Sequence, residues 1–193
     1  MKTHVTRALA LIVSAAMLQA CGGGGSTGGG GSSTAGTTIT TITLAGSNGD
    51  LSKYLGTWVS DCGFKLNIGQ VGGNAVTGVV NRFVFTTVSG SAITGVLTST
   101  EYTAFDCTGS STISSQNVRL TYVSNLLATG STGTTFFTGT ADSVTVGQVG
   151  SSSTTSMVTG FRDSFGKFQL TPSLPFSTAN MVYTKQLAFT SGS

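Results

Sequence analysis

Apolar and polar residues alternate in short runs along most of the chain after residue 50, and Gly, Ser and Asn interrupt these runs. Val118, Leu120 and Tyr122, for example, alternate with polar neighbours. A period of two is typical of half-buried β-strands. No segment repeats apolar residues at helical spacing over three turns. The pattern therefore predicts strands throughout this part of the chain.

The expected strands are short, and Gly, Pro or Asn separates most of them. Their number and spacing predict an all-β fold, a single antiparallel β-barrel or sandwich of about 8–10 strands. Besides strands around Val118, Val144 and Met181, we expect strands at residues 53–60, 64–68, 75–80, 82–88, 92–100, 134–138, 157–162 and 165–170.

The N-terminus carries the pattern of an export signal. Lys2 and Arg7 precede an apolar run at residues 8–17, and the small residue Ala20 precedes Cys21. This order is typical of a secretory signal peptide, and the run is too short to span a bilayer.

Leu18, Ala20 and Cys21 resemble the lipobox of bacterial lipoproteins, although Gln19 fits that motif loosely. The resemblance implies that Cys21 is acylated and becomes the first residue of the mature chain. Gly22 stands where an Asp commonly retains lipoproteins in the inner membrane, so the resemblance favours the outer membrane. The alternative is an ordinary secretory signal that leaves Cys21 as a free thiol.

A Gly-, Ser- and Thr-rich segment separates the signal peptide from the strand-rich part. We divide the chain into a signal peptide at residues 1–20, a flexible tether at 21–41 and a β-domain at 42–193. Residues 37–44 are β-prone and are either the end of the tether or a first edge strand. We expect them to be extended and loosely held.

Charge is sparse. Removal of residues 1–20 takes away Lys2 and Arg7, so the formal charge falls from +3 to about +1. The remaining Lys and Arg residues are scattered singly, which excludes a phosphate-binding patch and argues against a nucleic-acid partner. We expect membrane association to come from the lipid on Cys21.

Cys62 and Cys107 remain once Cys21 is assigned to lipidation. In an oxidising compartment an isolated pair is most simply a disulfide. The alternative is a redox-active or metal-binding pair. Metal sites favour short Cys-x-x-Cys or Cys/His spacings, and neither cysteine has such a neighbour.

Gly56 and Trp58 form a Gly-x-Trp motif on the first expected strand of the β-domain. Here the chain resembles a lipocalin-type barrel, and it is also similar to small bacterial lipoproteins with a GTW strand. The lipocalin resemblance implies that Trp58 plugs the closed end of the barrel against an Arg from a late strand, either Arg162 or Arg119. The chain departs from that family in lacking a clear second motif and a C-terminal helix.

Catalytic chemistry is restricted because His4, the only histidine, leaves with the signal peptide. This excludes Ser-His-Asp, Cys-His and His-ligated zinc sites. We expect a protein that is not an enzyme and has no cofactor or metal. The six carboxylates are expected to be solvated turn residues: Asp50, Asp61, Glu101, Asp106, Asp142 and Asp163.

The aromatic residues of the β-domain either line a cavity for an apolar ligand or fill a solid core. Phe136 and Phe137 are adjacent, so they face opposite sides of any strand. We expect an outer-membrane lipoprotein with a non-catalytic binding domain. It is either a lipocalin-like carrier of a small apolar ligand or an envelope interaction module, such as a hydrolase inhibitor.

Overall fold

The computed structural model describes residues 38–67, 75–162, 165–174 and 182–186. None of the helices in these ranges has the length and apolarity needed to cross a membrane. The elements are β1 (Thr40–Leu44), the 3-10 helix η1 (Leu51–Tyr54), β2 (Gly56–Ser60), β3 (Gly63–Asn67), β4 (Ala75–Ser89), β5 (Ala92–Tyr102), β6 (Ser111–Leu127), β7 (Gly130–Thr132), β8 (Thr135–Gln148), β9 (Thr154–Arg162), β10 (Lys167–Thr171) and β11 (Val182–Gln186).

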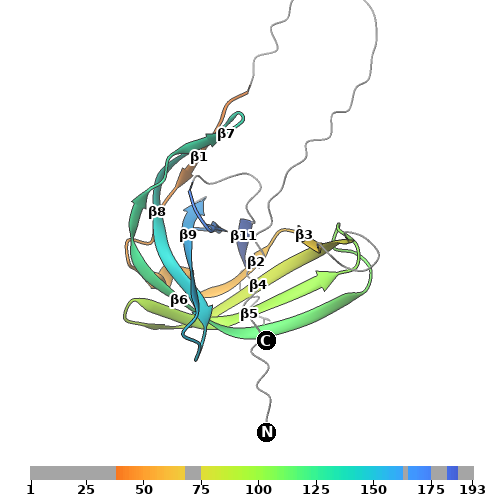
Figure 1. The fold of residues 1–193 in the computed structure, drawn as a ribbon. Coiled ribbons are helices and arrows are strands. Elements are labelled where there is room, and N and C mark those ends of the chain that lie inside the picture. The colour runs from red at the N-terminus through yellow and green to blue at the C-terminus, as the bar shows by residue number, and fades with distance from the viewer. Residues whose placement is uncertain (1–37, 68–74, 163–164, 175–181, 187–193) are drawn as a thin grey trace, which may run out of the picture.

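Eight strands form a closed antiparallel barrel, which confirms the expected fold class (Figure 1). Their order around the barrel follows the chain: β2, β4, β5, β6, β8, β9, β10 and β11. The barrel closes because β11 pairs with β2. This up-and-down order is the one that lipocalin-type barrels use.

The barrel interior is packed with large apolar side chains from every wall. Trp58 on β2 lies opposite Phe83 on β4, and Phe83 lies opposite Leu97 on β5. Alternate residues of a strand share a face, so the period of two in the sequence fills one continuous core. Its largest fully buried members are Trp58, Tyr54, Phe161 and Phe168.

Several strands are longer than the sequence predicts. Residues 75–80 and 82–88 form a single strand, β4. The expected strands at 134–138 and around Val144 are also parts of one strand, β8, which begins at Thr135. Backbone pairing continues through the polar residue Asn81, where the apolar pattern is interrupted. The expected strand at 53–60 instead begins with η1, and its N-terminal cap is the side chain of Asp50, which accepts from the Ser52 N–H.

The disulfide between Cys62 and Cys107 is present, as expected, and joins the start of β3 to the loop between β5 and β6. This loop folds back over β4, where the Gly78 N–H donates to the carbonyl of Ala104 at 2.9 Å. A Cβ at Gly78 would lie 2.5 Å from that oxygen, so only glycine permits the contact. The disulfide thus fastens the loop to the barrel wall.

A smaller sheet extends beyond the barrel, where β1, β7 and the first half of β8 lie together at the upper left of Figure 1. We call it the extension. β1 runs parallel to β8, with Thr40 opposite Thr135 and Leu44 opposite Gly139. The expectation of a loosely held segment at residues 37–44 is therefore wrong for Thr40–Leu44. Leu44 is buried with Phe137 in a second apolar cluster, which holds the strand in place.

Loss of the disulfide is expected to lower the free energy of unfolding by about 4 kcal/mol, because the bond closes a loop of about 46 residues in the unfolded chain. The measurement is urea denaturation of wild type and of the Cys62→Ser/Cys107→Ser double variant. Reducing agent should lower the wild-type midpoint and leave that of the double variant unchanged. Equal midpoints for the two proteins would contradict the prediction.

Candidate functional site

One end of the barrel is closed by η1 and the residues around it. The indole N–H of Trp58 donates to the carbonyl of Tyr54 at 2.7 Å, and both side chains are fully buried. The ammonium of Lys185, on the last strand, lies 5.2 Å from the centroid of the Trp58 ring. We call the group of Tyr54, Trp58 and Lys185 the plug, and its cation is a lysine that lies against the indole ring.

Gly56 is part of the same plug. Its φ of +113° is a conformation that side chains disfavour, and a Cβ there would lie 3.3 Å from Cε of Lys185. The glycine of the Gly-x-Trp motif therefore lets the chain leave η1 and makes room for the lysine stem.

The expected arginines lie elsewhere. Arg162 ends β9, where it is opposite Lys167 and half-buried, and its buried Nε has no hydrogen-bond partner. Arg119 is exposed on β6. Lys185 takes the place over the ring because β11 is the neighbour of β2 and sets Lys185 directly opposite Trp58.

A buried carboxylate, that of Asp142, lies at the closed end of the barrel, which we call the floor. Asp142 on β8 is fully buried, which corrects its assignment to a solvated turn. Its Oδ2 accepts from the Tyr54 hydroxyl at 2.8 Å and from the Ser47 N–H at 2.7 Å. A carboxylate can be buried at modest cost when several donors surround it. Asp142 thus ties the chain before η1 to the barrel wall.

Two tyrosines of the core, Tyr54 and Tyr183, stay protonated at physiological pH. Burial, the Asp142 charge and the hydrogen bond to that carboxylate raise the pKa of Tyr54 well above its usual range. Burial raises the pKa of Tyr183 to about 12, against a smaller opposing effect of its hydrogen bond with Asn81. Both hydroxyls therefore serve as neutral hydrogen-bonding groups at physiological pH, and neither is suited to act as a base.

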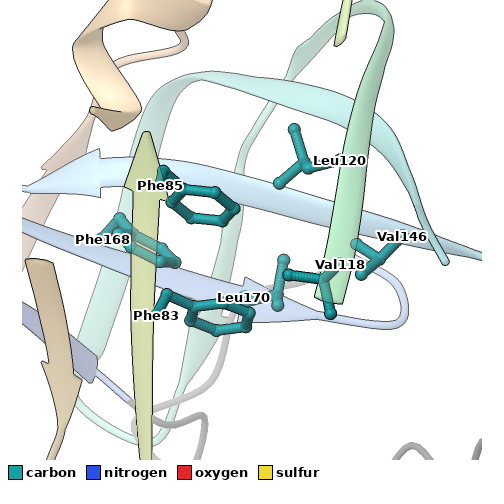
Figure 2. Close-up of a pocket in the computed structure, with 7 residues that line it drawn as sticks. All are labelled: Phe83, Phe85, Val118, Leu120, Val146, Phe168 and Leu170. Atoms are coloured by element: carbon teal, nitrogen blue, oxygen red, sulfur yellow. The ribbon is translucent and has the colours of Figure 1, made fainter. Parts of the chain in front are cut away.

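Further from the floor, the core leaves an apolar cavity (Figure 2). It offers a volume of about 10 Å³ to the centre of a water-sized sphere, which is room for about one water molecule. The side chains that converge on it come from four strands, β4, β6, β8 and β10: Phe83, Phe85, Val118, Leu120, Val146, Phe168 and Leu170.

Polar side chains line the barrel above this cavity, toward the end opposite η1. Gln116 lies opposite Leu97, and Asn81 lies opposite Ser99, with the Ser99 hydroxyl donating to Asn81 Oδ1 at 2.6 Å. Alternation places these residues on the same inward face as Phe83 and Val118. We call this half-buried set the polar mouth: Thr77, Asn81, Ser99, Glu101 and Gln116.

The other carboxylates among the described residues lie on different elements and loops: Asp50, Asp61, Glu101 and Asp106. Glu101 belongs to the mouth and accepts from the Thr77 hydroxyl at 3.0 Å. Asp106 is exposed in the loop that the disulfide fastens. The hydrogen bond from the Thr108 hydroxyl holds the pKa of the Asp106 carboxyl below its usual range. Among the described residues, no three His, Cys, Asp or Glu side chains lie close enough to hold a metal ion. Asp163 and Cys21 lie outside the described residues.

Sequence reasoning found Gly56 and Trp58 but missed Lys185, Asp142 and the polar mouth. The position of Lys185 could have been predicted, because the last strand of a closed up-and-down barrel must pair with the first. The inward direction of Gln116 could not, since its neighbours Ser115 and Asn117 are equally polar.

No family model, curated protein or solved structure matches the chain. The function is therefore argued from the geometry of the barrel and from the sequence of the N-terminal segment.

Replacing Asp142 by Ala should lower the free energy of unfolding by about 3 kcal/mol, because the Tyr54 hydroxyl and the Ser47 N–H would be buried without an acceptor. Asp142→Asn keeps one acceptor oxygen and should cost less. Urea denaturation at neutral pH measures both. Asp106→Asn, at an exposed carboxylate, is the matched control and should leave stability unchanged. An Asp142→Ala variant as stable as wild type would show that the floor does not depend on the carboxylate.

Proposed function

We propose that the protein is a lipid-anchored, non-catalytic binding protein of the outer membrane, whose barrel takes a small apolar molecule through its open end. The observation that carries the proposal is the apolar interior of a closed barrel, beneath a polar mouth. An apolar interior with a few polar groups at the entrance is the usual composition of small-molecule sites.

The size of the cavity defines how such a ligand binds. Room for about one water molecule holds no ligand unless side chains move. Phe85 on β4 and Leu120 on β6 both line the cavity, so a ligand larger than one water molecule displaces side chains such as these. Binding therefore involves a repacked core, in which the ligand replaces contacts within the buried cluster.

The anchor is supported by the sequence alone. Leu18, Ala20 and Cys21 form the lipobox-like end of a signal peptide, and residues 22–37 then connect Cys21 to the first described residue. More than one acyl chain gives stable attachment to a membrane.

A second function, an envelope interaction module, is favoured by the loop that the disulfide fastens. Phe105 at this loop is 69% exposed although the loop is fixed to the barrel at Cys107 and Gly78. An exposed aromatic side chain on a rigid loop is a common anchor for a protein partner. The site is distinct from the cavity, so the two functions can be tested separately.

Cys21→Ser should abolish acylation and lower the share of the protein that stays with the outer-membrane fraction. Mass spectrometry of the purified chain and fractionation of cells measure the two effects. Cys62→Ser is the matched control and should remain acylated and membrane-bound. A wild-type chain that carries no acyl mass at Cys21 would rule out the lipid anchor.

The barrel should bind the apolar fluorescent probe phenylnaphthylamine saturably, as fluorescence titration will show. Gln116→Trp puts a bulky side chain into the mouth and should weaken binding at least tenfold, equal to about 1.4 kcal/mol. Ser115→Trp, next along β6 on the outward face, is the control and should bind like wild type. Non-saturable binding, or equal affinities for the two variants, would refute the carrier function.

Phe105→Ala should then be tested for loss of a protein partner.

A further inference from the structure

The extension differs from the rest of the protein in having no charge at all. No Asp, Glu, Lys or Arg occurs at residues 8–49 or 120–141. These ranges contain all of β1 and β7, the end of β6 and the first half of β8. The nearest carboxylate along β8 is Asp142, which is fully buried. The exposed surface of the extension is therefore built from apolar side chains and from Ser, Thr, Asn and Gly.

One face of the extension exposes large apolar side chains. Leu127 is 75% exposed, Ile39 is 65% exposed and Phe136 is 44% exposed. Phe136 lies opposite Thr41, and Ile39 is two residues before Thr41, so these side chains share a face. Leu127 lies opposite Thr140, four residues along β8 from Phe136, and shares that face too. We call it the apolar face.

The other face of the same sheet is covered. Ile42 and Phe137, which alternate with Thr41 and Phe136, pack in the second apolar cluster. Folding thus buries one side of the extension and leaves the other side apolar and open. Exposed apolar surface of this kind, when it is grouped, marks a binding surface more often than single exposed side chains do.

The position of the extension indicates what covers this face. Sixteen residues, 22–37, connect Cys21 to Thr38, just before β1. As a random coil they would span about 22 Å. An acylated Cys21 would therefore hold the extension, rather than the open end, close to the lipid surface.

We propose that the apolar face docks on the bilayer that holds Cys21. The proposal rests on the lipid anchor of the proposed function. A sheet without charged residues that exposes apolar and aromatic side chains suits the region of lipid headgroups and upper acyl chains. A charged side chain in that region would oppose insertion. The acyl chains supply attachment, and the apolar face supplies orientation.

Docking sets the direction of the barrel. The extension continues from the closed end, next to the floor formed by Tyr54 and Asp142. The polar mouth lies at the opposite end of β4, β5 and β6. A protein docked by its extension thus keeps the mouth in the aqueous phase, where it can exchange a ligand with a soluble donor or acceptor.

The test uses the mature chain with Cys21→Ser, so that no acyl chain contributes. Flotation with vesicles of phosphatidylethanolamine and phosphatidylglycerol measures its partition coefficient. Leu127→Asp/Phe136→Asp should lower this coefficient at least tenfold, because both side chains leave the lipid and two charges replace them. The matched control is Val96→Asp/Val149→Asp, which changes two exposed valines on the barrel and should bind like the parent chain.

Circular dichroism and the urea midpoint show that each variant is folded with an intact barrel. Failure of the parent chain to bind vesicles, or equal partition of the two double variants, would overturn the proposal. It would also be overturned if the parent chain forms a dimer that Leu127→Asp/Phe136→Asp dissociates, since a second copy would then cover the face. None of these outcomes depends on probe binding, so failure of docking and failure of the carrier function are distinguishable.

Discussion

Closure of the sheet is the constraint on which the rest of the structure depends. Pairing of β8 with β9 and of β11 with β2 leaves the eight barrel strands without a free edge along their paired lengths. Eight strands enclose an interior just wide enough for side chains to fill. The aromatic packing of Trp58, Phe83, Phe161 and Phe168 follows from this width, and so does the small size of the cavity.

The two ends of the barrel differ in the residues that face the interior. The closed end must seal an apolar core from water. It does so with η1, with Lys185 over the Trp58 ring, and with the Asp142 carboxylate, which accepts from Ser47 and Tyr54 in a segment far away in the sequence. At the opposite end the inward residues are polar and can be hydrated, so they need no such seal.

Much of the fold follows from the alternation of apolar and polar residues, because half-buried strands impose it directly. The period of two predicted most strands, the fold class and the opposite exposure of Phe136 and Phe137, which are 44% and 2% exposed. Alternation does not say which face points inward where both faces are polar, so the mouth at Gln116 was not found. The burial of Asp142 was missed because its partners Tyr54 and Ser47 are 88 and 95 residues away in the sequence.

β1 joins the barrel to the rest of the N-terminal chain in a way that has a mechanical consequence. It runs parallel to β8, and its hydrogen bonds lie across the strand direction. A pull on the chain that precedes β1, directed along the strand, therefore loads these bonds together in shear, whereas peeling would break them one after another. Beyond them, the Ser47 N–H bound to Asp142 forms a second attachment. The first resistance to such a pull therefore lies in the extension, outside the closed barrel.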